Sequence, residues 1–228
     1  MNRVARSTEK TVKIAAEDVS LDGDLVIPPD PRGVVLFVHG SGSSRKSPRN
    51  RYVAGELNRA SIATLLFDLL TPQEEHRDVL TASLRFDIGL LTERLMEATD
   101  WALEQPELDE LRMGYFGAST GAAAALVAAG IRADISAVVS RGGRPDLAGP
   151  ALPRVTAPTL FIVGSEDHVV LDLNEQAMAQ MRCETRLEVV SGATHLFEEP
   201  GKLEEVARLA RLWFEGHLGR VQESDYAA

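Results

Sequence analysis

Short, largely apolar runs alternate along the chain with longer segments whose apolar positions recur at helical spacing. Apolar runs rich in β-branched residues are typical of strands buried on both faces of a parallel sheet. Such runs lie at residues 34–38, 62–67, 112–116, 137–140, 159–163 and 186–190. Helical spacing predicts helices at residues 48–60, 84–104, 120–130, 171–181 and 202–217. The alternation predicts an α/β fold with a mostly parallel, doubly wound sheet of about seven to eight strands and helices on both faces.

The two ends of the chain depart from this alternation. Residues 1–10 are polar and are expected to form a flexible N-terminus, and residues 219–228 a polar C-terminal tail. Residues 11–218 then form a single domain. Two short strands, 11–15 and 21–27, are expected to add an antiparallel section to the sheet, with the turn at or just before Asp22-Gly23-Asp24.

Two internal segments also interrupt the pattern. Residues 69–83 form an excursion whose charged part, 73–78, is expected to be a solvated loop or a short helix, and the excursion could serve as a flap or as plain surface. Residues 141–157 are rich in Gly and Pro and predict a loop with at most one helical turn. Because only about 18 residues separate Ser140 from Thr159, no lid domain is expected, and a site here should be open, shallow and wet.

Composition and charge narrow the classes of function. The 228 residues carry a formal net charge of −10 at pH 7, so nucleic acids and anionic membrane surfaces are not expected partners. The single cysteine, Cys183, leaves no internal disulfide, and no apolar stretch of a secretory signal follows the first residues, so a cytoplasmic location is expected. No run approaches the ~18 apolar residues of a membrane span. A monomer and a homodimer both remain open.

The segment Gly117-Ala118-Ser119-Thr120-Gly121 is a G-x-S-x-G motif between a predicted strand and a predicted helix. In that context the serine occupies a sharp turn that lifts its hydroxyl above the sheet edge, and the glycines let strand and helix approach closely. Ser119 is therefore the candidate nucleophile. The alternative is that Ser119 only caps the following helix within a glycine-rich turn.

A carboxylate and a histidine follow Ser119 in the order that this type of site requires. Asp167 comes after the strand 159–163, and His195 after the strand 186–190. Both predicted strands end at the edge where catalytic groups gather in open α/β sheets. Glu166 and Asp172 compete for the acidic position, and a capping role for Asp167 is the alternative. His217 lies at the end of the last predicted helix, where it is expected to interact with the helix dipole.

Two backbone N–H groups are needed to stabilise the oxyanion that forms during acyl transfer. One is expected from Thr120, directly after the nucleophile, and the other from Ser41 in the loop His39-Gly40-Ser41-Gly42, with Gly42 as the next choice. His39 itself is expected to shape this loop.

Strand, His-Gly loop, G-x-S-x-G turn, late Asp and late His together resemble the α/β-hydrolase superfamily over about residues 10–218. Residues 41–50, 67–70 and 140–147 resemble its dienelactone-hydrolase-like branch. The resemblance implies a hydrolase, although dienelactone hydrolases use a cysteine nucleophile where this chain has Ser119. Cys183 cannot take that place, because it lies near the end of a predicted helix, away from the turn.

The expected function is hydrolysis of small carboxylic esters or lactones by a Ser-His-Asp acyl-enzyme mechanism. The substrate could be anionic, since Arg141 and Arg45 lie in loops after strands, and the resemblance implies arginines that bind a carboxylate; solvated or structural arginines are the alternative. A thioesterase or peptidase with the same residues, and a non-catalytic binding module, remain open. Neither a metal-ligand cluster nor a dinucleotide-binding G-x-G-x-x-G after a strand is found, so no metal or cofactor is expected.

Overall fold

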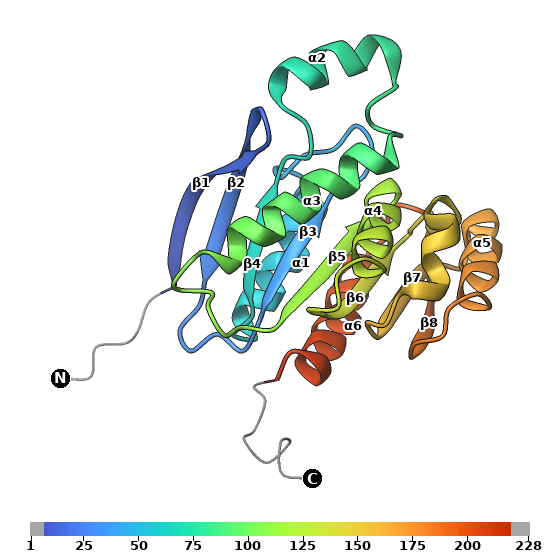
Figure 1. Cartoon of the computed structure of the whole chain (residues 1–228). Helices are drawn as coiled ribbons and strands as arrows, with labels where there is room; N and C mark the ends of the chain where they lie inside the picture. Colours follow the sequence, from blue (N-terminus) through green and yellow to red (C-terminus); the bar gives the residue numbers. More distant parts are fainter. Residues whose placement is uncertain (1–6, 220–228) are drawn as a thin grey trace.

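The centre of the molecule is an eight-stranded sheet, seen in a computed structural model that describes residues 7–219 (Figure 1). The strands lie in the order β1-β2-β4-β3-β5-β6-β7-β8. All neighbours from β4 to β8 pair in parallel, whereas β1 and β2 are antiparallel additions. The bounds are β1 Thr8–Ala16, β2 Val19–Ile27, β3 Val34–Val38, β4 Ala63–Phe67, β5 Met113–Ala118, β6 Ile135–Arg141, β7 Thr159–Gly164 and β8 Thr185–Val190.

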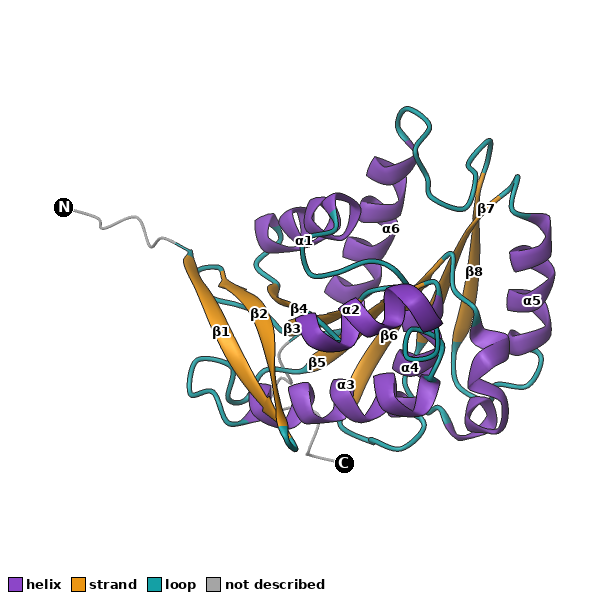
Figure 2. Cartoon of the chain, turned by 90° about the horizontal axis from the view of Figure 1, so that it is seen from above, coloured by secondary structure: helices purple, strands orange, loops and turns teal. Residues whose placement is uncertain are grey.

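Helices cover both faces of the sheet, as the alternating pattern predicted (Figure 2). One face packs against α3 (Ile88–Leu103), α4 (Thr120–Ala129) and α5 (His168–Met178) through the larger of two apolar cores. The other face packs against α1 (Pro48–Arg59) and α6 (Lys202–His217). The central strands β3, β4, β5 and β7 are buried along their whole length, which explains their unbroken apolar sequence.

The N-terminal hairpin differs from the prediction. Its turn lies at Glu17 and Asp18, between the paired residues Ala16 and Val19, and Glu17 has a positive φ of 40°. The turn expected near Gly23 is wrong, because Gly23 lies inside β2 and pairs with Val12 on one side. A Cβ at Gly23 would lie 3.0 Å from Val12 Cγ2, so this glycine allows close packing within the sheet.

The start of the chain is also more ordered than expected, since β1 begins at Thr8, inside the stretch predicted to be flexible. Residues 1–6 and 220–228, which hold the rest of that stretch and nearly all of the predicted tail, lie outside the described residues. Within residues 7–219, no helix combines the length and apolarity needed to span a membrane.

The two internal segments contain more helix than their sequences indicated. The excursion holds α2 (Pro72–Thr81), whose N-terminus is closed by a reciprocal capping box between Thr71 and Glu74. Figure 1 shows α2 standing above the edge of the sheet where the parallel strands end. The Gly/Pro-rich loop contains the short-pitch helix η1 (Pro145–Arg154), which is kinked at Gly149. The connection from β6 to β7 adds no lid domain.

Candidate active site

The turn between β5 and α4 places Ser119 at the edge of the sheet. Ser119 has φ 52° and ψ −122°, a strained conformation for a residue with a side chain. Its amide donates to the carbonyl oxygen of Arg141 at the end of β6, at 3.3 Å. The neighbouring glycines are sterically required: a Cβ at Gly117 would lie 2.4 Å from Ala122 Cα, and one at Gly121 2.2 Å from the carbonyl oxygen of Val38. Ser119 is the N-cap residue of α4 but makes no capping hydrogen bond.

Asp167 and His195 meet at the same edge of the sheet. His195 Nδ1 lies 2.6 Å from Asp167 Oδ2, and Asp167 is much less exposed than the imidazole. Asp167 occupies the N-cap position of α5, yet its side chain makes no capping bond there. The competing carboxylate, Glu166, instead accepts a hydrogen bond from Ser165 Oγ at 2.9 Å.

Backbone contacts join the loop of Asp167 to the loop of His195. The Glu166 amide donates to the Ala193 carbonyl at 3.0 Å, and a Cβ at Gly164 would lie only 2.2 Å from that same oxygen. The imidazole packs over the end of β6, where a Cβ at Gly142 would lie 3.4 Å from His195 Cε1. Gly142 is two residues beyond Ser140, which pairs with Gly117 in the neighbouring strand. The three loops therefore follow β5, β7 and β8 at one edge of the sheet, with the end of β6 between the Ser119 turn and the Asp167 loop.

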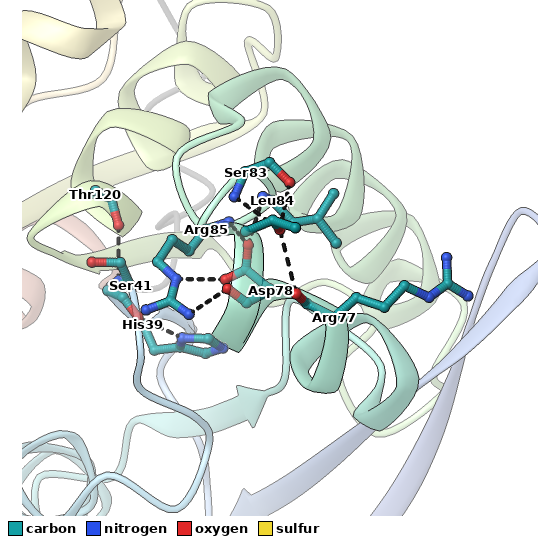
Figure 3. A network of polar contacts seen from close by, with 10 residues as sticks. His39, Ser41, Arg77, Asp78, Ser83, Leu84, Arg85 and Thr120 are labelled. Atoms are coloured by element: carbon teal, nitrogen blue, oxygen red, sulfur yellow. Dashed lines mark hydrogen bonds and ion pairs between the residues drawn. The ribbon is translucent and has the colours of Figure 1, made fainter.

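The loop after β3 packs against the Ser119 turn. A Cβ at Gly40 would lie 3.0 Å from Ser119 Cβ, and the Ser41 amide donates to Thr120 Oγ1 at 3.0 Å (Figure 3). The N–H group of Ser41 is therefore already hydrogen-bonded to the hydroxyl oxygen of Thr120. His39 fixes this loop through both ring nitrogens. Its Nε2 accepts a hydrogen bond from the Leu69 amide at 3.1 Å. The ring proton is therefore on Nδ1, which donates to the Gly40 carbonyl oxygen at 3.0 Å. Burial lowers the pKa of His39, which favours this neutral form.

A cavity of about 560 Å³ opens between this loop and the excursion that contains α2. Its apolar lining comes from Leu69, Leu70, Pro72, Val79 and Leu91, and its polar lining includes Glu75, His76, Asp78 and Arg85.

Arg85 joins both sides of this cavity. Its Nε donates to Asp78 Oδ2 at 2.5 Å, and its Nη2 donates to the Asp78 carbonyl at 2.8 Å (Figure 3). Its Nη1 lies 3.8 Å from the position that a Cβ at Gly42 would take. Arg85 was not predicted as a site residue, because it fell inside the predicted helix 84–104. In the structure α3 begins only at Ile88, and Arg85 returns to the loop after β3.

The two arginines that the sequence nominated have different surroundings. The Arg45 guanidinium forms an ion pair with Asp68 and lies 3.8 and 3.6 Å from the carboxylates of Asp22 and Asp24. Its charge is balanced within the protein, which favours the structural alternative for this residue. Arg141 is 7% exposed, and its Nη2 donates to the Asn50 side-chain oxygen at 3.1 Å.

Two other residues that the sequence singled out, His217 and Cys183, lie in α6 and in the connection between α5 and β8. His217 accompanies the end of α6, where its Nδ1 lies 2.8 Å from the carbonyl oxygen of Trp213. Cys183 is partly buried in the connection between α5 and β8. Among residues 7–219, no group of three or more His, Cys, Asp or Glu side chains is placed to hold a metal ion.

The sheet order, with its antiparallel start and parallel remainder, is that of the α/β-hydrolase fold. The model of the dienelactone hydrolase family matches residues 50–215, and the chain belongs to this family. A dienelactone hydrolase from Anabaena variabilis ATCC 29413 has 56% identity and a TM-score of 0.92, with 94% of this chain and 100% of that chain covered. Est1E from Butyrivibrio proteoclasticus shares the fold at 16% identity, with a TM-score of 0.76 over 90% of this chain and 98% of that chain.

Curated relatives from Mycobacterium tuberculosis match 92% of this chain at 57% identity over 211 residues. One of them, from strain H37Rv, bears the name "Putative phosphoribosyl transferase Rv0571c". The match covers 47% of that protein, so the chain spans about half the length of the curated relatives it matches. Their name describes the whole of these longer proteins.

Proposed function

We propose that the chain is a serine hydrolase that cleaves small carboxylic esters or lactones through an acyl-enzyme intermediate on Ser119. The observation that carries this proposal is the 2.6 Å contact between His195 Nδ1 and Asp167 Oδ2 at the strand ends beside the strained Ser119 turn. A helix cap or a binding surface requires neither the strain nor the buried partner of the imidazole. The family and its esterase-like fold support the same conclusion.

In the proposed mechanism, Asp167 stays ionised and accepts a hydrogen bond from His195 Nδ1–H. This bond fixes the tautomer whose Nε2 lone pair takes the proton of Ser119 Oγ. The alkoxide attacks the ester carbonyl carbon and forms a tetrahedral oxyanion. His195 then returns the proton to the leaving alcohol, and water repeats the sequence on the acyl-enzyme.

The proposed oxyanion donors are the backbone amides of Thr120 and Ser41. The Ser41 amide already donates to Thr120 Oγ1. To stabilise the oxyanion, it must either form a bifurcated hydrogen bond to both oxygens or leave Thr120 Oγ1 for the oxyanion. The next amide in the loop, that of Gly42, is the alternative donor.

The cavity beside the loop supports a small and partly polar substrate. Its volume of about 560 Å³ suits a compact molecule, and its lining mixes leucines with Glu75, His76 and Arg85. Arg85 is the side chain in it that could donate to a substrate oxygen near Gly42, since its Nη1 faces that loop. Arg45 has no place in the proposed substrate site, because three carboxylates surround its charge.

The test is labelling with a fluorophosphonate probe, followed by turnover of p-nitrophenyl esters of increasing acyl length. We expect the wild type to be labelled and to hydrolyse acetate or butyrate fastest. Ser119→Ala should lose both labelling and turnover, whereas Ser83→Ala, which removes an exposed hydroxyl, should keep both. Labelling that persists in Ser119→Ala would identify another nucleophile. A wild type that neither reacts nor turns over any ester would favour the non-catalytic binding module.

A further inference from the structure

One face of α2 forms a wall of the cavity of about 560 Å³ beside the Ser41 loop. Helical residues at i, i+3, i+4 and i+7 lie on the same side of a helix. Pro72, Glu75, His76 and Val79 have this spacing, and all four line the cavity. This wall therefore combines apolar surface with two polar side chains that face the loop of a proposed oxyanion donor.

Glu75 differs from the other carboxylates around this cavity in having no partner within the protein. Asp78, which also lines the cavity, binds the Arg85 guanidinium, and Asp68 forms an ion pair with Arg45. Within residues 7–219, the side chain of Glu75 makes neither a hydrogen bond nor an ion pair. An ionised carboxylate offers only acceptor oxygens, so the group that complements Glu75 is a hydrogen-bond donor.

The surroundings of Glu75 make its carboxylate less comfortable than one in open solvent. Partial burial raises the pKa of Glu75, and the carboxylates of Asp68 and Asp78 add to the rise, whereas Arg85 opposes it. A ligand that donates a hydrogen bond to Glu75 would offset this cost, because hydrogen bonds to a charged group are stronger than those between neutral groups.

The same cavity also offers a free donor, the Nη1 group of Arg85. Arg85 uses Nε and Nη2 for its hydrogen bonds to Asp78, whereas Nη1 bonds to none of residues 7–219 and faces Gly42. A carboxylate placed here would be repelled by Glu75, and an ammonium group by Arg85. A hydroxyl group suits both, because it donates one hydrogen bond and accepts others.

We propose that Glu75 is a specificity-determining residue that accepts a hydrogen bond from a hydroxyl group of the substrate, and that Arg85 Nη1 donates to the same hydroxyl or to a neighbouring one. Leu69, Leu70 and Leu91 line the cavity as well and would contact the carbon skeleton. The substrates are then uncharged esters or lactones that carry a hydroxyl in the acyl or the alcohol part. This inference rests on the proposed ester hydrolysis and names the substrate class of that site.

Two pairs of neutral esters test the proposal, each pair differing only in hydroxyl groups. Glyceryl monobutyrate is compared with n-propyl butyrate, and p-nitrophenyl β-hydroxybutyrate with p-nitrophenyl butyrate. We expect kcat/KM of the wild type to favour the hydroxylated ester at least about tenfold in one of the pairs, since a site built to bond a hydroxyl discriminates against the analogue that lacks it. Equal kcat/KM within both pairs would overturn the proposal and leave the ester hydrolase intact.

Variants assign the preference to its residues. Glu75→Ala should bring the ratio of the preferred pair close to one, and Glu75→Gln, which keeps an acceptor oxygen without the charge, should retain part of it. Arg85→Lys keeps a cation for Asp78 but loses Nη1, so it should lower the ratio less than Glu75→Ala does. The control is Glu93→Ala, which removes an exposed carboxylate of α3 outside this cavity and should leave the ratio unchanged.

The fold of α2 should survive the change at Glu75, because the capping box of Thr71 and Glu74 remains and alanine favours a helix. A full preference in Glu75→Ala would therefore overturn the role of this residue. An unchanged ratio in Arg85→Lys would refute the part assigned to Nη1.

A thermal melt tests the subsite without turnover. In the Ser119→Ala protein, glyceryl monobutyrate should raise Tm more than n-propyl butyrate at the same concentration, or the hydroxybutyrate ester more than its butyrate analogue, because a ligand that binds the folded state stabilises it. Adding Glu75→Ala should remove the difference. A wild type that hydrolyses none of the four esters but shows this Glu75-dependent difference would refute the ester hydrolase and support the hydroxyl subsite. No difference in Tm within either pair would overturn the subsite.

Discussion

The two sides of the candidate site are built differently. On one side, the Ser119 turn and the loops of Asp167 and His195 are held by backbone hydrogen bonds and by glycines that have no room for a Cβ. On the other side, α2 rises above the sheet edge and exposes Val79 at 74% and Leu80 at 84%, and the segment after it exposes Phe86 at 55%. The Asp78–Arg85 network ties the end of α2 to the segment that follows it.

This difference suits the two sides to different functions: one positions groups rigidly, and the other can open. Groups that transfer protons must be held to within a fraction of an ångström, which a packed sheet edge provides. A helix with few buried apolar contacts opens at a lower free energy than the core does, so it can admit substrates of different shape. If the proposed function is right, the side with Ser119, Asp167 and His195, the proposed catalytic side, should respond to substitution by losing rate or fold, and the α2 side by changing substrate binding.

The largest expected effect is on catalysis, from Asp167→Asn. The amide of Asn can donate its NH2 group to Nδ1, which leaves the imidazole proton on Nε2, the wrong tautomer for a base. It also carries no charge to stabilise the imidazolium. We expect kcat for a p-nitrophenyl ester to fall about 10⁴-fold while Tm changes little. Steady-state kinetics and a thermal melt measure the two quantities.

Glu166→Gln is the matched control, because it changes the neighbouring carboxylate, which accepts from Ser165 and not from His195. We expect it to retain nearly full kcat. A loss in Glu166→Gln equal to that in Asp167→Asn would show that the acidic residue is assigned to the wrong position.

The next effect is on stability, from Gly121→Ala in the first turn of α4. The new Cβ would lie 2.2 Å from the Val38 carbonyl oxygen and 2.5 Å from that of His39, so β3 and α4 must move apart. We expect the free energy of unfolding to fall by about 3 kcal/mol, measured by urea denaturation. Activity should fall with it, since the same displacement moves Ser119.

Gly55→Ala in α1 is the corresponding control, because a Cβ there meets no atom within 4 Å. The gain in helix propensity should stabilise this variant by up to about 1 kcal/mol. If both variants were equally stable, the close approach of β3 and α4 would not be a constraint on the nucleophile turn.

The two sides of the site also differ in how much of their structure could be predicted from the sequence. The strands 34–38 and 159–163 and the helix 202–217 were located almost to the residue, because burial on both faces or along one helix face leaves a strong apolar pattern. Ser119, Asp167 and His195 were placed from the predicted strands 112–116, 159–163 and 186–190, which each of them follows. The close contact between Asp167 and His195 could be expected, because adjacent parallel strands end at the same edge.

The remaining features depend on contacts between segments that are far apart in the chain. Such contacts leave no periodic pattern in a single sequence. The charged excursion gave no apolar stripe, so the sequence left a solvated loop and a short helix open at the position of α2. The return of Arg85 to Gly42 was not predicted. Gly23 indicated a turn, although it lies within β2 against Val12. Arg45 and Arg141 were both nominated as loop arginines, Arg141 first because it directly follows a strand. Their partners, three carboxylates for Arg45 and an amide for Arg141, could not be read from the sequence.

The smallest effect on the fold is expected from Asp78→Asn on the α2 side. Burial raises the pKa of Asp78, but hydrogen bonds from the Arg85 side chain and from the amides of Arg85 and Leu84 outweigh it, so the pKa lies below its ordinary value of 3.8. The carboxylate therefore stabilises the segment above that value, and the stabilisation is lost as the pH falls below 3.8 towards the lowered pKa. Asn at this position should reproduce the acid state at neutral pH.

Hydrogen exchange measured along the chain tests this expectation. In Asp78→Asn, amides of residues 72–86 should exchange faster at neutral pH, whereas those of β5 and β7 should keep their protection. KM should rise more than kcat falls, because the altered segment lines the cavity and the proposed proton-transfer groups lie on the other side. Leu80→Ser, at the most exposed apolar position of α2, should leave the exchange of residues 72–86 nearly unchanged. Faster exchange throughout the sheet in Asp78→Asn would instead show that α2 and the catalytic side unfold as one unit.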